Sequence, residues 1–396
     1  MQSVAEARSR ILAALSPVAA ETVALAEAAG RVLARPVAAR LTQPPAAVSA
    51  MDGYAVRAGD AALGARLRVV GAAPAGHPFA GKVGPGQAVR IFTGAYVPAG
   101  ADGILLQEDA TADDGDVVVN EAVTAGRWIR PAGLDFALGE ELLAPGRRLR
   151  ARDIGLAAAA NHPWLFVHRR PRIGILATGD EIALPGDPLP AGGIVSSNAH
   201  ALAALVRAAG ADPVVLPIAP DNVDAIATLA AGARGCDMLV TTGGASVGEH
   251  DLVQKALGPQ GFALDFWKIA MRPGKPLIWG QLNDVPMLGL PGNPVSALVC
   301  GVVFLLPALA VLGGLPAAQT TTVAAVAGAD LPANDEREDY LRCTLRDGVA
   351  TPFARQDSSM LKTLARADAL LIRTPHAEAL PAGAPVSIID LAALGI

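Results

Sequence analysis

The feature that most constrains the fold is an alternation of strands and helices in the middle of the chain. It begins with Arg172–Ala177 (RIGILA), whose apolar run is typical of a buried strand. The elements expected to follow are a helix at 197–209, a strand at 214–218, a helix at 223–233 and a strand at 238–240. Strands joined through helices form a parallel sheet with right-handed crossovers, and such sheets bind ligands at the carboxyl ends of their strands. The sequence therefore predicts a multidomain α/β protein with its site at that edge.

The length of 396 residues suggests two to four domains, and the residue pattern changes along the chain. The expected units are a helical or mixed domain formed by 1–43 and 138–170, an inserted β domain at 44–137, the α/β domain at 171–318 and a β-rich domain at 319–396. Amphipathic patterns favour helices at 3–15 and 22–34 in the first unit. Glycine, proline and short alternating runs indicate strands in the second and fourth units.

Charge and cysteine content argue against several classes of protein. Aspartate and glutamate outnumber lysine and arginine, 37 to 32, which argues against a nucleic-acid-binding protein. The three cysteines are widely spaced and form no CxxC motif, so a reducing compartment fits better than a disulfide framework. The first residues lack the apolar core of a signal peptide. We therefore expect a cytoplasmic protein.

One apolar stretch, 295–313, is long enough to cross a membrane. Two features favour a buried helix instead: Pro307 interrupts the stretch, and no lysine or arginine flanks it. We expect no membrane association.

Adjacent acidic residues follow the first strand of the α/β unit, in the segment LATGDE. Thr178 and Gly179 allow the backbone to turn, which places Asp180 and Glu181 at the carboxyl edge of the sheet. Carboxylates suit a hard cation such as Mg²⁺. The alternative is a surface loop with solvated acids, and the position directly after a buried strand favours the cation site.

A glycine-rich turn follows the strand at 238–240, in the segment TTGGASVGEHD. The hydroxyls of Thr241, Thr242 and Ser246 and the accessible backbone N–H groups suit a phosphate. No Gly-Lys-Ser/Thr follows, so the segment is not a Walker A loop, and its spacing does not match a dinucleotide fingerprint. A plain loop is an equal alternative.

Two later segments offer groups that bind anions. Arg272 and Lys275 flank a Pro-Gly turn and can converge on one anion, although two solvated surface bases are the simpler interpretation of this segment alone. Asn293, Pro294 and Ser296 lie where the long apolar helix is expected to begin. A helix N-terminus attracts anions, but ordinary capping explains these residues equally well.

The remaining patterns are less informative. Asp52 in SAMDGYAV and Asp135 in WIRPAGLD have no physical interpretation beyond β-turns. The histidines and cysteines have no zinc-binding spacing, and no GxSxG elbow occurs. A zinc site and a hydrolase triad therefore have no support.

Together, these segments resemble the molybdopterin molybdotransferase family, which includes the C-terminal domain of gephyrin. Eight motifs occur in family-like order over essentially the whole chain: MDGYAV, RIFTGAYVPAGAD, IRPAGLD, ATGDEI, SSNAHAL, TTGGASVGEHD, MRPGKP and GLPGNPVSA. The resemblance implies four domains, with a molybdopterin-binding α/β domain and a C-terminal β-barrel, and an elongated homodimer whose active sites are built from both subunits. Leu134 stands where the family usually has an acid, and Asp357 and Ser359 stand where it usually has glycines.

The resemblance also implies the reaction. Molybdenum from molybdate enters the dithiolene of adenylylated molybdopterin, the pyrophosphate bond is hydrolysed with the help of Mg²⁺, and AMP leaves. The residues implied to bind the organic substrate are Thr178, Gly179, Asp180, Ser197, Asn198, Thr242, Gly243, Gly244, Ser246, Pro291, Gly292, Asn293 and Pro294. Those implied to bind molybdate are Arg272, Lys275 and Ser296, and more weakly Arg337 and Ser358.

Four carboxylates are implied to take part in the reaction. They are Asp52, Asp135, Glu181 and Asp251, and Asp180 and Glu181 are the expected Mg²⁺ ligands. Asp52 and Asp135 come from the inserted domain, so we expect them to act on the α/β domain of the other subunit of the homodimer.

Two alternatives are open at this point. Molybdopterin adenylyltransferases carry a similar TTGG loop, but they resemble residues 172–303 only. A non-catalytic, cofactor-binding scaffold would need extra partner regions, and the chain has no long linker. For the transferase we also expect transient contacts with molybdopterin adenylyltransferase and with the molybdoenzymes that receive the product.

Overall fold

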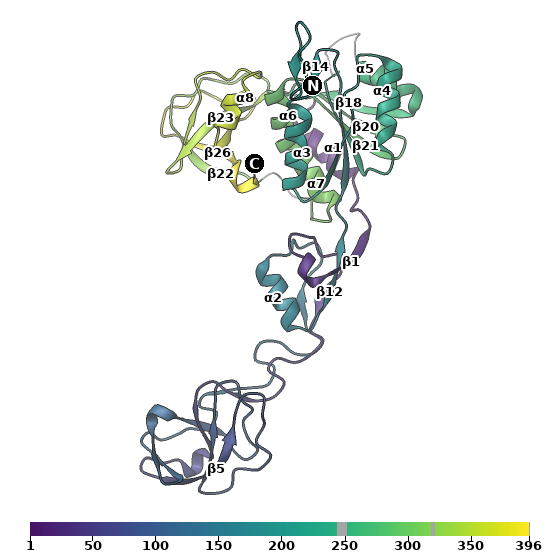
Figure 1. The fold of residues 1–396 in the computed structure, drawn as a ribbon. Coiled ribbons are helices and arrows are strands. Elements are labelled where there is room, and N and C mark those ends of the chain that lie inside the picture. Colours follow the sequence, from purple (N-terminus) through teal and green to yellow (C-terminus); the bar gives the residue numbers. More distant parts are fainter. Residues whose placement is uncertain (244–251, 318–320, 396) are drawn as a thin grey trace.

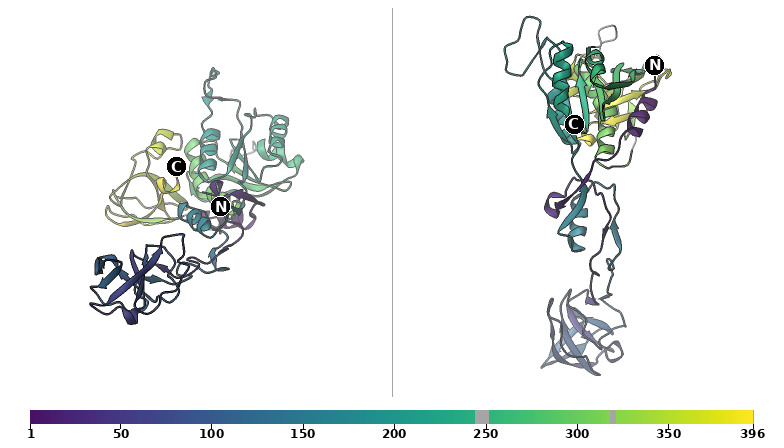
Figure 2. Two further views of the ribbon diagram at one scale, coloured as in Figure 1. Left: turned by 60° about the horizontal axis from the view of Figure 1, so that its bottom comes forward. Right: turned by 90° about the vertical axis from the view of Figure 1, so that its right-hand side faces the viewer.

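The computed structural model describes residues 1–243, 252–317 and 321–395, and the molecule is elongated (Figure 1). A broad head contains both chain termini, a narrow stalk follows, and a small β domain lies at the far end (Figure 1). The right-hand view of Figure 2 shows the same separation of head and β domain.

The head contains a six-stranded sheet with the order β16-β13-β17-β21-β20-β18. Its strands are β13 (Arg172–Ala177), β16 (Asp212–Val215), β17 (Met238–Thr242), β18 (Phe262–Lys268), β20 (Pro276–Leu282) and β21 (Val285–Leu290). The first four strands in the sheet order run parallel, and β20 runs antiparallel to both of its neighbours. The predicted parallel α/β domain is therefore confirmed.

Helices cover both faces of this sheet. On one face lie α1 (Val4–Ala13), α3 (Asn198–Ala208) and the helical run 294–312, and on the other lie α4 (Val223–Ala230) and α5 (Leu252–Leu257). Alternate residues of a strand pack into the cores on opposite faces of the sheet: Val240 packs against the face covered by α1 and α3, and Leu239 against the face covered by α4 and α5. This alternation is the period-two pattern expected of a strand that is buried on both faces.

The long apolar run is an internal helix of the head. It comprises α6 (Pro294–Cys300), a π-helical turn (Gly301–Leu305) and α7 (Leu306–Leu312). By length and composition it could cross a membrane, but 78% of its most apolar window is buried inside the protein. The predicted buried helix is confirmed, because its apolar side chains form the core beside α1 and α3.

The stalk differs from its prediction in one element. Residues 22–34 do not form a helix: β1 (Ala20–Ala24) pairs antiparallel with β12 (Trp164–His168), and a short 3-10 turn follows. The β-branched Thr22 and Val23 favour this pairing, and Gly30 has φ +78°. The stalk also contains the helix α2 (Ala151–Ala159). In addition, the short strand β2 (Val37–Ala38) pairs antiparallel with β11 (Glu141–Leu143).

The first helix belongs to the head by its packing. Val4, Ala7 and Ile11 of α1 are buried with the sheet and with α7. The stalk has its own small core of Ala28, Leu33, Val37, Leu143, Leu149, Ala157, Leu165 and Val167. The prediction placed residues 1–43 in one unit, because the residue pattern does not indicate which core the first helix joins.

The far β domain is a six-stranded sheet with the order β7-β4-β6-β5-β9-β8. Its strands are β4 (Gly53–Val56), β5 (Arg66–Ala73), β6 (Gln87–Ile91), β7 (Gly103–Leu106), β8 (Ala110–Asp113) and β9 (Asp116–Val119). A side chain at Gly53 would place its Cβ 2.0 Å from the carbonyl oxygen of Leu105, so only glycine fits there. A pair of short strands, β3 (Val48–Ser49) and β10 (Ile129–Arg130), connects this domain to the stalk.

The C-terminal unit is a closed five-stranded β-barrel, as the family resemblance implies. Its strands are β22 (Val323–Ala327), β23 (Glu338–Arg346), β24 (Val349–Pro352), β25 (Ala369–Arg373) and β26 (Pro385–Asp390), and the β23–β25 pairing closes it. A short helix, α8 (Leu361–Ala365), precedes β25. One strand of the α/β module, β19 (Met271–Arg272), pairs with β23 and joins the two parts of the head.

The burial of the apolar helix generates a prediction on stability. Leu305 is fully buried, and Leu305→Ala should lower the free energy of unfolding of the head by ~2–5 kcal/mol, because the change leaves a cavity. Leu63→Ala, at a largely exposed leucine of the β domain, should change it by less than ~0.5 kcal/mol. Urea unfolding followed by circular dichroism measures both. Equal unfolding midpoints for the two variants would contradict a buried helix.

Candidate active site

A cleft of about 940 Å³ lies at the carboxyl edge of the α/β sheet. The turns after β13, β17 and β21 line it, together with the starts of α3 and α6 and two residues of the C-terminal unit, Ser359 and Leu361. The predicted site residues that line the cleft are Thr178, Gly179, Glu181, Ser197, Asn198, Thr242, Gly243, Pro291, Gly292, Asn293, Pro294 and Ser296. Residues separated by more than 100 positions thus meet at one edge, as expected for parallel strands.

The side chain of Asn198 ties two of these turns together. Its Nδ2 donates to Oγ1 of Thr242 at 2.8 Å and to the carbonyl oxygen of Gly292 at 2.7 Å. The hydroxyl of Thr242 in turn donates to the carbonyl oxygen of Pro291 at 3.2 Å. Asn198 is the first residue of α3, and no side-chain hydrogen bond caps that helix. The residue therefore positions the cleft floor.

The cleft floor depends on a close approach of two backbones. Gly243 has φ +90°, and a Cβ there would lie 2.3 Å from the carbonyl oxygen of Thr178. Only glycine permits this distance. The hydroxyl of Thr178 is buried and has no hydrogen-bond partner among the described residues. The floor thus brings the backbones of two turns together beside a hydroxyl that no described residue bonds.

The acidic residues after β13 have two different environments. Glu181 lines the cleft, whereas Asp180 does not: its carboxylate accepts a hydrogen bond of 2.9 Å from the backbone N–H of Asp221. Burial, and then the charges of Asp180 and Glu181, raise the pKa of Asp221. Negative charge therefore gathers at this rim, which favours a bound cation.

The described part of the chain contains no group of three or more His, Cys, Asp or Glu residues that could hold a metal ion. Three predicted residues, Gly244, Ser246 and Asp251, lie outside the described residues.

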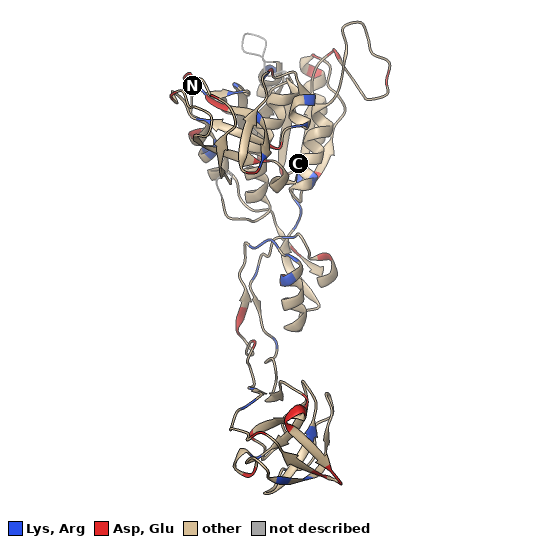
Figure 3. Ribbon diagram, turned by 90° about the vertical axis from the view of Figure 1, so that its left-hand side faces the viewer, with Lys and Arg blue, Asp and Glu red and all other residues tan. Residues whose placement is uncertain are grey.

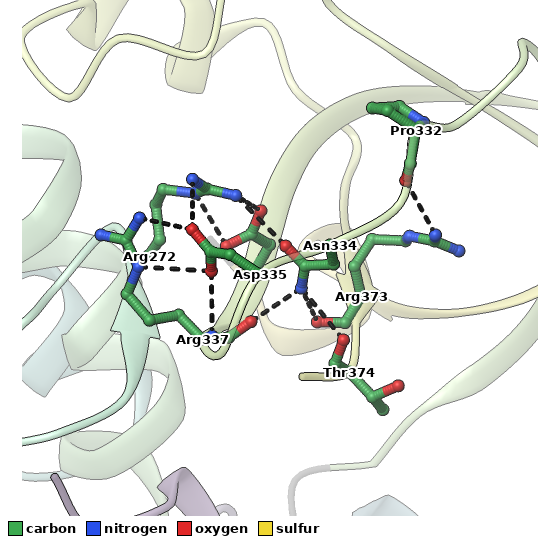
Figure 4. Close-up of polar contacts among 8 residues, drawn as sticks. Arg272, Pro332, Asn334, Asp335, Arg337, Arg373 and Thr374 are labelled. Atoms are coloured by element: carbon green, nitrogen blue, oxygen red, sulfur yellow. Dashed lines mark hydrogen bonds and ion pairs between the residues drawn. The ribbon is translucent and has the colours of Figure 1, made fainter. Parts of the chain in front are cut away.

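Arg272 is the centre of an ion-pair cluster between the α/β module and the barrel (Figure 4). Its guanidinium forms two hydrogen bonds with the carboxylate of Asp339, one of them of 2.8 Å from Nε, and a third of 3.2 Å with Asp335. Asp335 also pairs with Arg337 at 2.7 Å, and these arginines, Arg337 first, lower the pKa of Asp335 to about 2. Sequence reasoning missed Asp335 and Asp339, because no local pattern links them to a residue more than 60 positions earlier.

Lys275, by contrast, is exposed, and its ammonium group has no partner among the described residues. The next residue, Pro276, lines the cleft. Of the two bases that flank the Pro-Gly turn, Lys275 is therefore the one that has no ion pair with a described residue.

A loop of the barrel completes the cleft at the start of α6. Ser358 accepts a hydrogen bond of 3.0 Å from Nδ2 of Asn293, and its carbonyl oxygen accepts one of 3.2 Å from the N–H of Val295. Arg342, buried on the face of β23 that carries Tyr340, holds this loop, since it donates at 3.0 Å to Gln356 and at 2.8 Å to the carbonyl oxygen of Asp357. Sequence reasoning missed Arg342 as well.

The unusual residues at 357 and 359 form a turn of their own. Oδ1 of Asp357 accepts hydrogen bonds from the backbone N–H of Ser359 at 2.8 Å and from its hydroxyl at 2.6 Å. These bonds lower the pKa of Asp357. Side-chain hydrogen bonding thus stabilises a turn without glycine, and the loop still reaches the cleft.

Asp52 and Asp135 lie far from the cleft of their own chain. Asp52 follows β3 in the β domain, where its carboxylate accepts two hydrogen bonds of 2.7 Å from Thr93, which lower its pKa. Asp135 is exposed on the segment that returns from the β domain to the stalk. Neither residue lines the cleft, and Figure 1 shows the β domain separated from the head by the stalk.

Comparisons with known protein families cover nearly the whole chain. Residues 2–161 match the MoeA N-terminal region (domain I and II), residues 174–311 match a probable molybdopterin binding domain, and residues 324–391 match the MoeA C-terminal region (domain IV).

Individual proteins match over similar lengths. A protein of Nostoc sp. named molybdopterin molybdenumtransferase is 36% identical over 386 residues, covering 94% of this chain and 88% of that protein. Molybdopterin molybdenumtransferase 2 of Mycobacterium tuberculosis is 37% identical over 384 residues, covering 93% and 95%. The crystal structure of the molybdopterin biosynthesis MoeA protein from Pyrococcus horikoshii has a TM-score of 0.86 at 27% identity, covering 98% of this chain and 99% of that chain. The chain therefore belongs to the molybdopterin molybdenumtransferase family.

Proposed function

We propose that this protein inserts molybdenum from molybdate into adenylylated molybdopterin, with hydrolysis of the pyrophosphate bond and release of AMP. The observation that carries the proposal is the 940 Å³ cleft, whose lining joins the polar turns of the α/β sheet to a loop of the barrel. Relatives named molybdopterin molybdenumtransferase match all parts of the chain. Nothing favours an adenylyltransferase, which would not need the β domain or the barrel.

The organic substrate carries a pyrophosphate, and the cleft offers neutral and dipolar groups for it. The backbone around Gly243 and Gly292 and the hydroxyl of Thr178, which has no partner among the described residues, provide donors. The helical run that begins at Pro294 adds the positive end of its dipole. These groups would hold the substrate while its phosphorus is exposed to water.

We also propose that Mg²⁺ binds at the acidic rim with the pyrophosphate. Mg²⁺ usually takes one or two carboxylates and completes its shell with phosphate oxygens and waters. Glu181 and Asp221 both line the cleft, and burial, followed by the charges of Asp180 and Glu181, raises the pKa of Asp221. When bound, the ion would neutralise charge that develops on the phosphates.

Molybdate is a dianion, and the net charge of the protein is −5, so local cations must attract it. Lys275 offers a charge next to the cleft that no described residue pairs with, and Ser296 offers a hydroxyl within the cleft. Arg272 and Arg337 share Asp335, and Arg272 also pairs with Asp339, so we assign these two arginines the weaker attraction. Ser358 is tied to Asn293 and would act at the same rim.

The distant carboxylates support a homodimer with shared sites. The β domain exposes three large apolar side chains near Asp52: Met51, Phe92 and Trp128. Clustered apolar side chains on a surface indicate a contact with another protein. We propose that Asp52 and Asp135 of one subunit act at the cleft of the other, that the enzyme works in the cytoplasm, and that it meets the adenylyltransferase and the recipient molybdoenzymes transiently.

The proposed activity has a direct test. Purified protein, adenylylated molybdopterin and Mg²⁺ should release AMP when molybdate is present and release much less when it is absent. Chromatography of AMP measures both reactions. A protein that binds the substrate but releases no AMP under either condition would be a scaffold, and the proposal would fail.

Lys275→Ala should raise the molybdate concentration that gives half-maximal AMP release roughly tenfold to a hundredfold, because a charge-assisted contact contributes about 1.5–3 kcal/mol. Binding of adenylylated molybdopterin should stay nearly unchanged. Lys82→Ala, at an exposed lysine of the β domain, is the matched control. If Lys275→Ala weakened the binding of adenylylated molybdopterin and left the molybdate concentration for half-maximal AMP release unchanged, Lys275 would be a phosphate ligand.

Glu181→Gln should raise the Mg²⁺ concentration required for activity by roughly tenfold, since a carboxylate ligand becomes a neutral amide. A Mg²⁺ titration of AMP release measures the change, with the exposed Glu141→Gln of the stalk as the control. An unchanged Mg²⁺ requirement would remove Glu181 from the metal site.

Asp135→Asn should keep the fold and ligand binding but lose turnover, because the change removes only a charge.

If the two subunits share their active sites, light scattering should give a dimer at micromolar concentration. Co-refolding Asp135→Asn with Lys275→Ala should then restore, at low molybdate, about a quarter of the wild-type rate, because random mixing gives half heterodimers with one intact site each. A monomer, or no restoration, would place both residues in one subunit's site.

A further inference from the structure

A second cavity, of about 220 Å³, lies at the joint between the stalk and the head. Its walls come from the stalk segments 29–32 and 168–171, from Arg148, and from the ends of α3 and α7. Basic residues dominate the lining, and we call this cavity the joint pocket: Arg31, Arg148, His168, Arg169, Arg170 and Arg207. Figure 3 shows the basic stretches of the ribbon meeting at this narrow part of the molecule.

Two of the five arginines have carboxylate partners outside the pocket. Arg31 pairs with Glu21, and Arg169 forms two hydrogen bonds with Asp237, one of them of 2.7 Å. No acidic residue lines the pocket itself. Arg148, Arg170 and Arg207 have no ion pair with any carboxylate in the described part of the chain.

Three guanidinium groups that have no carboxylate partner among the described residues therefore line one cavity, and burial lowers the pKa of Arg148. The chain does not lack acids to neutralise them, because it has 37 acidic and 32 basic residues. A surface that gathers positive charge in an acidic protein is suited to a negatively charged ligand.

Arg148 is already oriented for such a ligand. Its Nη1 donates to the carbonyl oxygen of Gly30 in the stalk at 3.2 Å, and its Nη2 donates to that of Ala209 at the end of α3 at 3.1 Å. These bonds fix the guanidinium plane and cover a helix carbonyl that would repel an anion. A guanidinium has five N–H donors, so three of them remain.

We propose that the joint pocket binds a phosphate-class oxyanion between Arg148, Arg170 and Arg207. Its volume is several times the ~30 Å³ that one water molecule occupies, which is enough for a phosphoryl group with part of its hydration shell. Arg170 belongs to the stalk and Arg207 to the head, so the bound anion joins the two parts. The site is independent of the substrate cleft and of the proposed reaction.

The test uses the full chain and inorganic phosphate as the probe, in isothermal titration calorimetry at low ionic strength. The wild type should bind phosphate, and the double variant Arg170→Gln/Arg207→Gln should bind it at least tenfold more weakly, because each charged contact contributes at least that factor. Both side chains are exposed, so the variant should fold, which circular dichroism checks. Arg234→Gln, an exposed arginine elsewhere in the head, should leave the affinity unchanged.

The substrate cleft is a second place where phosphate could bind, and Lys275→Ala distinguishes the two. The proposal predicts that Lys275→Ala keeps the joint-pocket affinity that the double variant loses. It is overturned if the wild type binds no phosphate at millimolar concentration, or if only Lys275→Ala weakens binding. It is also overturned if the double variant changes the oligomeric mass and leaves phosphate binding intact, since the arginines would then serve a subunit contact.

Discussion

The register of three parallel strands determines the position of the candidate active site. β13, β17 and β21 end at the same level, and the N–H of Thr178 donates to the carbonyl oxygen of Thr242 at 3.0 Å just beyond them. Because the strands end together, three turns far apart in sequence form one floor. Asn198 and Gly243 then bring the turns into hydrogen-bond or backbone contact. A change in register would move every group in the cleft.

The barrel depends on the same edge through a second set of contacts. Arg272 binds Asp335 and Asp339 across the boundary, and Ser358 accepts from the start of α6. The positive and negative charges within this cluster nearly cancel. The cluster is therefore better suited to holding the two domains together than to binding an anion. The exposed Lys275 has no carboxylate partner among the described residues, although only three positions separate it from Arg272.

Periodicity and motif order were sufficient to predict the α/β sheet, the buried helix and most residues that line the cleft. They failed where a partner lies far away in the sequence. Residues 20–24 form a strand because the pairing of β1 with β12, 140 or more positions away, outweighs local helix preference. The first helix was predicted, but its packing in the core of the head depends on α7, about 300 positions away, and has no local signal. Asp339 and Arg342 escaped prediction for the same reason: a lone charged residue in a strand carries no local signal of its contact.

The insertion of the β domain into the stalk has a consequence for its mechanical attachment. The chain enters the domain through β3 and leaves it through the adjacent β10, so two covalent strands run side by side along the connection. A protease that cuts one strand leaves the other, and the domain stays tethered to the head. Two tethers also restrict rotation about the long axis more than a single linker does. The spacing between the head and the far carboxylates is therefore set by a double strand, which keeps its length under thermal motion better than one flexible segment.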